Sequence, residues 1–184
     1  MPEVLTRSVP LDDLELRASA REISGVIVPF NSPANLGGYT ESFTKGAFAR
    51  TIAERGSRVK LLFAHDQTRP LGRASELVEE ARGLIGTFKV ARTQAGDEAI
   101  ELVASGSIDS FSVGFVPITD SWTRGSEHVD RLEVKLLETS LVTLPAFDGA
   151  RIESMRSALQ PYDPELDPEL LARALDLSHL RKRY

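Results

Sequence analysis

A histidine, a serine and a carboxylate, each in a different strand-like segment, carry the clearest chemical potential in this sequence. His65 follows the apolar run at residues 59–64, Ser112 lies in DSFSVGF, and Glu138 lies in LLETSLVTLPA. A serine hydroxyl becomes a strong nucleophile when an imidazole takes its proton, and a carboxylate can orient that imidazole. The three residue types together favour acyl transfer, the chemistry of a nucleophilic hydrolase.

Two of these residues also have a structural interpretation. Strand alternation places His65 on one face with Val59, Leu61 and Phe63, so a partly buried histidine bonded to a backbone carbonyl is one alternative. Glu138 is a carboxylate in phase with the apolar residues of its strand, where burial without a partner would be costly. An imidazole that donates Nδ1–H would supply that partner. An ion pair with Arg73 or Arg82 is the alternative. The in-phase residues are Leu132, Val134, Leu136, Ser140, Val142 and Leu144.

Ser112 shares its strand face with Ser110 and Gly114, opposite Phe111, Val113 and Phe115. Serines on strands usually face solvent, and that is the plain interpretation of this one. Gly114 removes a side chain on the same face and leaves room for a substrate backbone. Gly106 and the small residues before the strand offer backbone N–H groups, from which an oxyanion hole is built.

Hydrophobic periodicity and turn residues predict the elements that must position these side chains. Strands are expected at residues 21–30, 58–64, 71–77, 84–90, 109–118 and 131–144. Helices are expected from Thr44, as N-cap, to Gly56, and at 96–105 and about 149–159. Residues 31–42 are rich in turn formers and indicate a loop, and residues 121–130 indicate a polar connection.

This pattern predicts a mostly β fold with flanking helices, of the α+β class. We expect six or seven antiparallel strands in a closed or nearly closed β-barrel, because βαβ signals are few. Residues 1–158 are expected to form one domain with its core at 20–158. Residues 159–184 are expected to form a proline-broken linker followed by an amphipathic tail helix.

Composition argues against several classes of function. Cysteine is absent, which excludes disulfides, thiolate nucleophiles and cysteine-bound zinc. Net charge is −5 and basic residues cluster only at 181–183, which argues against nucleic-acid binding. Glycine-rich phosphate loops are missing, so we expect no nucleotide cofactor. We also expect no metal, because Asp66 should point away from His65 and the other histidines, His128 and His179, should face solvent.

Hydropathy argues against a membrane protein. No apolar stretch approaches the roughly 18 residues that a membrane-spanning helix needs. The N-terminal segment MPEVLTRSVPLDDLELR has acidic residues where a signal peptide would have an apolar core. We therefore expect a protein that is made and used in a cytoplasm.

Four segments of the chain resemble the tailed-phage prohead maturation proteases of the HK97 type. These segments are GVIVPFNSPANLGGYTESFTKGAFA, LLFAHDQTRPLGR, GSIDSFSVGF and LLETSLVTLPAFDGARI. They occur in the family's order and at similar spacing, and the match covers residues 22 to 152. The resemblance implies a barrel similar to that of the herpesvirus assembly proteases, with His65 as general base and Ser112 as nucleophile. The third residue of the herpesvirus proteases is a second histidine, and the comparable interval here ends at Glu138.

The resemblance also implies a function. A prohead protease of this type is a serine endopeptidase that cleaves scaffold, or a scaffold-like segment of the major capsid protein, inside the assembling procapsid in the bacterial cytoplasm. Self-cleavage is implied as well, with the proline-broken tail as a candidate site, and self-association is a further expectation. Two alternatives stay open: an inactive capsid-assembly module that binds scaffold, and a hydrolase for small esters, which would need a deep apolar pocket.

Overall fold

A computed structural model describes residues 4–10, 15–123, 125 and 127–143 of the 184-residue chain. The predicted helix at about 149–159, the linker and the tail helix lie outside the described residues, as does His179. None of the described helices is long and apolar enough to cross a membrane.

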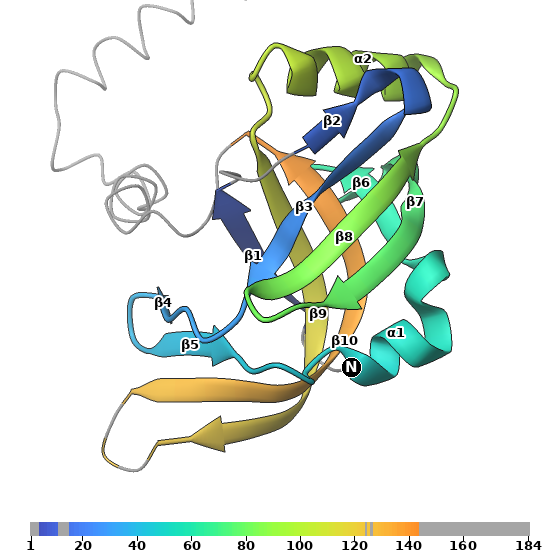
Figure 1. Cartoon of the computed structure of the whole chain (residues 1–184). Helices are drawn as coiled ribbons and strands as arrows, with labels where there is room; N and C mark the ends of the chain where they lie inside the picture. Colours follow the sequence, from blue (N-terminus) through green and yellow to red (C-terminus); the bar gives the residue numbers. More distant parts are fainter. Residues whose placement is uncertain (1–3, 11–14, 124, 126, 144–184) are drawn as a thin grey trace, which may run out of the picture. The chain divides into compact units, whose positions relative to one another are not determined.

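The described residues form ten strands and two short α-helices (Figure 1). The helices are α1 (Ala49–Arg55) and α2 (Gln94–Ala104), with 3-10 turns η1 (Ala18–Ala20) and η2 (Gly56–Arg58). The strands are β1 (Leu5–Pro10), β2 (Glu15–Arg17), β3 (Glu22–Pro29), β4 (Ala34–Asn35), β5 (Thr40–Phe43), β6 (Lys60–Phe63), β7 (Asp66–Glu79), β8 (Gly83–Val90), β9 (Ser110–Trp122) and β10 (His128–Val142). The expectation of a mostly β fold with flanking helices is confirmed.

One curled sheet contains these strands, in the order β1-β9-β10-β6-β7-β8-β3-β2, with β5 beside β10 and β4 beside β5. The prediction of a closed or nearly closed barrel is wrong. Figure 1 shows a half-barrel whose order ends at β1 and β2, which do not pair with each other. The strands are mostly antiparallel, as expected, but β10 is parallel to both β5 and β6. Bulges in β3, β7 and β10 add local bending to the ordinary strand twist.

The structure has four strands that were not among the predicted ranges, and all four are short. β1 and β2 lie before the predicted core, and β4 and β5 lie within residues 31–42, which we expected to be a loop. The expected polar connection at 121–130 is also shorter, because β9 runs to Trp122 and β10 begins at His128. Residues 117–122 and 128–133 project with β4 and β5 as an arm (Figure 1). Such polar or brief strands give almost no hydrophobic alternation to detect.

Local hydrogen bonds determine where the two helices begin. Thr93 caps α2, accepting from the backbone N–H of Gly96. Thr44 does not cap α1; its hydroxyl donates to the carbonyl of Arg131 instead. The helix begins after Phe48, and the Glu79 carboxylate accepts the N–H groups of Gly46 and Phe48. After α1 the chain continues directly into η2.

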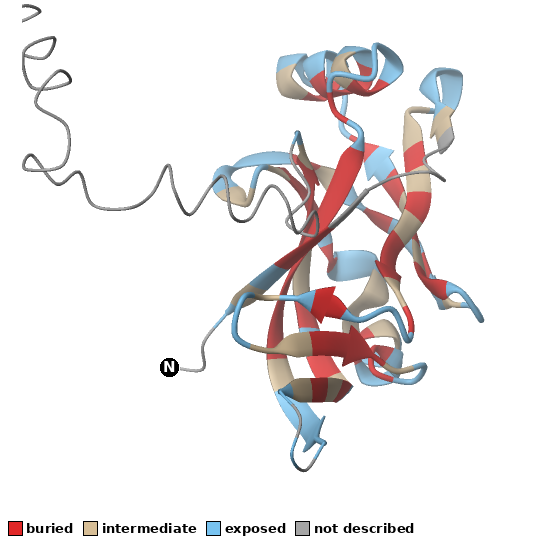
Figure 2. Cartoon of the chain, turned by 90° about the vertical axis from the view of Figure 1, so that its left-hand side faces the viewer, coloured by how far each residue is buried: buried red, intermediate tan, exposed pale blue. Residues whose placement is uncertain are grey.

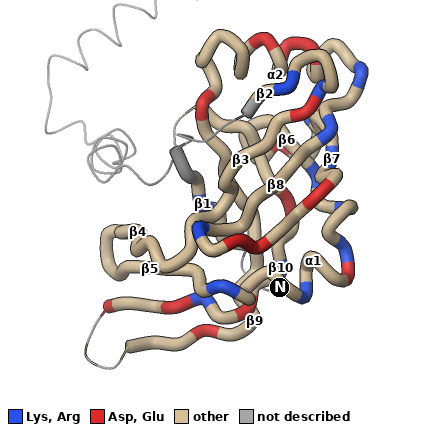
Figure 3. Tube along the Cα trace, viewed as in Figure 1, with Lys and Arg blue, Asp and Glu red and all other residues tan. Residues whose placement is uncertain are grey.

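An apolar core fills the inside of the curl. Figure 2 shows buried residues along the central strands and exposed residues on the outer side of α2 and at the tip of the arm. Aromatic rings connect distant segments: Phe43 contacts both Phe48 and Phe115, and Phe88 contacts Phe111. Positive and negative residues are interspersed along the trace in Figure 3. The ring contacts on the core side of β9 hold in place the strand that carries Ser112.

Candidate active site

β9 holds Ser112 on the face opposite the core. Phe111, Val113 and Phe115 on the core side are fully buried, which anchors the strand. Ser112 is also 0% exposed, so the alternative of a solvent-facing serine does not hold. The cause is β1, which runs antiparallel along β9 and places Ser8 opposite Ser112.

His65 lies in a tight turn rather than on a strand. β6 ends at Phe63, β7 begins at Asp66, and Phe63 pairs with Asp66 across the hairpin. Both turn residues have positive φ, 49° for Ala64 and 61° for His65. This is the type I′ pattern, which normally favours Asn or Gly and is disfavoured for other side chains. The predicted strand alternation around His65 is therefore wrong, and the turn projects the imidazole toward β9 and β10.

A bulge in β10 determines where Glu138 points. Val134 and Leu136 face the core, and the register against β9 then shifts between Leu136 and Glu138. Beyond the shift, Leu141 faces the core while Glu138 lies opposite Gly114. Glu138 is therefore out of phase with the apolar residues, contrary to the simple alternation. It shares a face with the serine of the neighbouring strand.

The three side chains form a continuous hydrogen-bonded chain. His65 Nε2 lies 2.7 Å from Ser112 Oγ, and His65 Nδ1 lies 2.7 Å from Glu138 Oε1. The side chains of His65 and Glu138 are 29% and 15% exposed. The alternative ion pairs are not formed: Arg73 donates to the carbonyl of Ser57, and Arg82 lies near Glu80. A carboxylate that accepts Nδ1–H holds Nε2 ready to accept the serine proton.

Ser140 is a residue of this site that sequence reasoning missed. Its hydroxyl donates to Glu138 Oε2 at 2.7 Å and accepts the backbone N–H of His65 at 3.0 Å. Ser140 lies opposite Ser112 in the β9–β10 ladder and is fully buried. It therefore connects the strained turn to the carboxylate. The signal available in the sequence was its spacing of two from Glu138, which places both side chains on one strand face.

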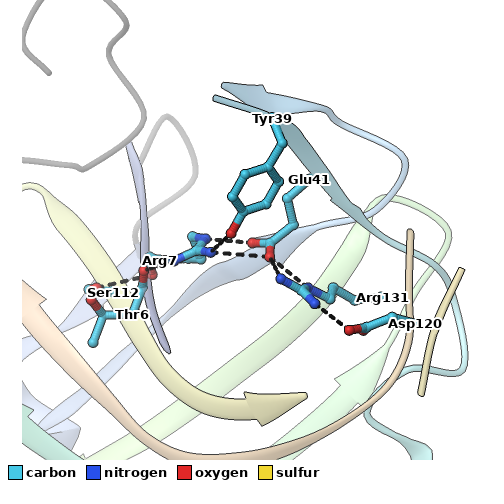
Figure 4. A network of polar contacts seen from close by, with 7 residues as sticks. All are labelled: Thr6, Arg7, Tyr39, Glu41, Ser112, Asp120 and Arg131. Carbon is cyan, nitrogen blue, oxygen red and sulfur yellow. Dashed lines mark hydrogen bonds and ion pairs between the residues drawn. The ribbon is translucent and has the colours of Figure 1, made fainter. Parts of the chain in front are cut away.

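The N-terminal strand lies directly over the serine. Ser112 Oγ is 3.0 Å from the carbonyl oxygen of Arg7 (Figure 4), and it is also 2.7 Å from His65 Nε2. A hydroxyl has one proton, so it cannot donate to both acceptors at once. When Arg7 accepts it, Nε2 must donate to Oγ and the imidazole cannot act as base. The strand both covers the serine and competes for its proton.

Comparisons with known proteins identify the family of the chain and a similar fold. The family described as caudovirus prohead serine protease matches residues 9–164. The chain belongs to this family. It is 29% identical over 86 residues to the prohead protease of Escherichia phage T5, a segment that makes up 46% of this chain and 40% of the T5 protein. The fold is similar to that of the bacteriophage T4 capsid assembly protease, with a TM-score of 0.58 and 13% identity over 77% of this chain and 98% of the T4 chain.

In this prohead protease, the roles expected for Gly114 and Gly106 differ from those that the structure shows. Gly114 does not leave space for a substrate backbone, because a methyl group there would overlap the Glu138 carboxylate. The glycine therefore makes room for the side chain of Glu138. Gly106 ends α2 with a positive φ of 72°, and its N–H donates to the carbonyl of Val103. It is not a free oxyanion donor.

The remaining described histidine lies in the arm. His128 is not solvent-exposed as expected, since its side chain is 23% exposed and its Nδ1 lies 2.7 Å from Thr40 Oγ1. Asp66 closes a local turn by accepting from the N–H and hydroxyl of Thr68, and these hydrogen bonds hold the pKa of its carboxyl below the usual range. Within the described ranges, no three His, Asp or Glu side chains gather as a metal-binding group.

Proposed function

We propose that the protein is a serine endopeptidase in which Ser112 is the nucleophile, His65 the general base and Glu138 the group that orients the imidazole. The observation that carries this proposal is the unbroken chain from Ser112 Oγ through both ring nitrogens of His65 to Glu138, with both distances at 2.7 Å. Membership of the prohead serine protease family supports the same chemistry.

The proposed reaction is acyl transfer. Ser112 Oγ attacks a peptide carbonyl carbon while His65 Nε2 takes the hydroxyl proton, and Glu138 stabilises the resulting imidazolium. His65 then gives the proton to the leaving amine as the C–N bond breaks. Water, activated by the same imidazole, hydrolyses the acyl-enzyme and restores Ser112. Backbone N–H groups stabilise the oxyanion, and one such donor is typically worth about 3 kcal/mol of the barrier.

The geometry supports an extended polypeptide as substrate. β1 lies along β9 as an added antiparallel strand, and the carbonyl at its centre meets the nucleophile. An incoming peptide that replaced β1 would use the same strand addition, a common mode of peptide recognition. From the family, the proposed substrates are scaffold or a scaffold-like segment of the major capsid protein, cleaved inside the procapsid. A small-ester hydrolase would not need a strand-shaped groove.

Self-cleavage has a candidate site in the described residues. The tail proposed from composition lies outside them, whereas β1 presents the Arg7 carbonyl to Ser112. We propose that the bond between Arg7 and Ser8 is cleaved when β1 shifts enough for Oγ to face the carbonyl carbon. Release of residues 1–7 would then open the groove. Until that step, the competition for the serine proton keeps the protein inactive.

The decisive experiment is co-expression with the cognate capsid protein, followed by intact-mass measurement of both chains. Wild type should yield a truncated capsid protein and a form of its own chain that begins at Ser8, and Ser112→Ala should yield neither. Ser112→Ala removes one buried oxygen, so the thermal unfolding midpoint should remain close to wild type. Full processing by Ser112→Ala would refute the assignment of Ser112 as the nucleophile. No processing by wild type would favour the inactive capsid-assembly module.

A further inference from the structure

The side chain of Arg7 is buried on the core side of β1. Its side chain is 10% exposed, although it projects from a strand at the end of the sheet order. Nε donates to Glu41 Oε1 and Nη2 to Glu41 Oε2, so the guanidinium and the carboxylate form a two-pronged pair (Figure 4). Tyr39 Oη lies 3.4 Å from Nη2, and the guanidinium lies 5.7 Å from the centre of the Phe115 ring. This is a built pocket for one side chain.

The pocket is charge-balanced only while Arg7 occupies it. Glu41 is 0% exposed and also accepts from Arg131, which in turn pairs with Asp120. With Arg7 present, two positive and two negative side chains form the network in Figure 4. Without Arg7, one positive and two negative side chains remain, and a buried carboxylate loses two hydrogen bonds. Such a carboxylate strongly favours a new cationic partner.

The register links this pocket to the nucleophile. Arg7 is the residue whose carbonyl oxygen lies 3.0 Å from Ser112 Oγ, and its side chain occupies the pocket of Tyr39, Glu41 and Phe115. A peptide that replaced β1 in the same register would place the side chain of the residue before the scissile bond in this pocket. We infer that Glu41 is the specificity-determining residue, and that it selects arginine immediately before the bond to be cleaved. This inference rests on the proposed peptidase function.

Arginine should be preferred over lysine. Both oxygens of Glu41 accept from Arg7 through two different nitrogens, a geometry that a planar guanidinium satisfies and a single ammonium cannot. The Nη1 group adds a third bond, to the carbonyl of Thr6. Glutamate at this position would face Glu41 directly and should be rejected.

The test uses the full chain and a set of quenched fluorescent peptides based on residues 4–10, identical except at the position of Arg7. The panel contains Arg, Lys, Gln, Leu and Glu. We expect kcat/KM to fall about 10-fold from Arg to Lys and about 100-fold to Gln or Leu, because hydrogen bonds to a buried charge are among the strongest in proteins. No cleavage is expected for Glu. Equal rates, or a preference for Leu or Glu, would overturn the inference while leaving the peptidase in place.

Glu41→Gln keeps the size of the side chain and removes its charge. It should lower cleavage after Arg about 100-fold but lower cleavage after Gln much less. The ratio of kcat/KM for the Arg peptide to that for the Gln peptide therefore falls, whereas partial unfolding would lower both rates equally. Glu54→Gln is the matched control, because it makes the same change of charge at an exposed residue that pairs with Arg50 and lies outside this network. It should keep the wild-type Arg-to-Gln ratio. An unchanged ratio in Glu41→Gln would refute the role of Glu41. If wild type cleaves no peptide and processes no capsid protein, the proposed function itself fails, and this inference fails with it.

Discussion

Two clusters in the described part of the chain contain a histidine, a serine and a carboxylate, and they are connected in different ways. In the candidate active-site cluster, His65 lies between its partners, with Ser112 on Nε2 and Glu138 on Nδ1. In the arm cluster, Ser42 donates directly to Asp130 at 2.5 Å. Both of these groups lie on the Nε2 side of His128, at 3.4 and 3.2 Å, while its Nδ1 contacts Thr40.

The comparison shows that connectivity, rather than residue type, separates a candidate catalytic triad from a structural cluster. An imidazole can take a serine proton while a carboxylate orients it only when the serine and the carboxylate lie on different ring nitrogens. In the arm, the Ser42 hydroxyl donates its proton in a hydrogen bond to the Asp130 carboxylate, so the imidazole of His128 has no serine to activate. Two histidines of similar exposure therefore lead to opposite expectations.

The largest predicted effect distinguishes the two imidazoles. His65→Ala removes the proposed base and should lower capsid-protein cleavage by about a millionfold, the scale seen when the base of a serine protease is removed. His128→Ala removes a structural contact and should leave cleavage within a few-fold of wild type. Quantitative mass spectrometry of the capsid fragments measures both. If His128→Ala were the inactive variant, the assignment of the two clusters would have to be exchanged.

The carboxylates provide the next contrast. Glu138→Gln keeps the size of the side chain but can favour the wrong imidazole tautomer, so we expect a loss of about 10²- to 10⁴-fold in the cleavage rate. Asp130→Asn makes the equivalent change in the arm and should not slow cleavage measurably. Rates from single-turnover cleavage of the capsid protein compare the two. Wild-type activity of Glu138→Gln would make the role of Glu138 structural.

Gly114 sharpens the comparison, because the Glu138 carboxylate occupies the space that this glycine leaves. Gly114→Ala would place a methyl group against the Glu138 carboxylate and push it away from His65. We expect cleavage to fall about 100-fold, somewhat less than or similar to the effect of Glu138→Gln. Gly56→Ala is the matched control, since a methyl group there meets no atom within 4 Å. Equal activity of the two variants would show that Glu138 tolerates displacement.

Ser140 should have a smaller effect, because it positions other groups and touches no reacting atom. Ser140→Ala removes the hydrogen bonds to Glu138 and to the backbone of His65, and we expect about a 10-fold loss in kcat with KM nearly unchanged. Ser140→Thr retains the hydroxyl and should restore part of the rate. A purely structural role would lower the unfolding midpoint without this difference between the two variants.

The sequence contained the participants of the site but not the geometry that joins them. Ser112 was predictable because the alternation of Phe111, Val113 and Phe115 is regular through β9. His65 and Glu138 were expected in the site, but the strand alternation that was used to place their side chains was wrong. The I′ turn uses Ala64 and His65, neither of which signals positive φ, and the β10 bulge follows Leu136 without a glycine to mark it. Alternation has a period of two, so one bulged residue reverses every later side chain.

The position of β1 over Ser112 and the pocket of Glu41 could not be predicted from the sequence either, for a different reason. β1 is six residues long and pairs with a strand about one hundred positions later, as Ser8 pairs with Ser112. No local pattern encodes such a pairing. Glu41 lies in a segment that looks like a loop, because β5 is stabilised by its neighbours β4 and β10 and not by its own hydrophobic pattern.

The smallest predicted effect concerns the pH dependence of the arm. The hydroxyl of Ser42, with a further contribution from His128, holds the pKa of Asp130 below its ordinary value of about 3.9. A carboxyl with a lowered pKa in the folded state stabilises the fold above its unfolded pKa, and this contribution is lost as pH falls through the folded value.

Ser42→Ala removes the main cause of the shift, so the unfolding midpoint of wild type should exceed that of the variant above pH 5 by about 1 °C or less, because the group is partly exposed. The difference should narrow as pH falls toward 3. Thermal unfolding at several pH values, with cleavage measured in parallel, tests this directly. A Ser42→Ala variant that lost cleavage together with stability would contradict the separation of the two clusters, because Ser42 would then be coupled to the reacting groups.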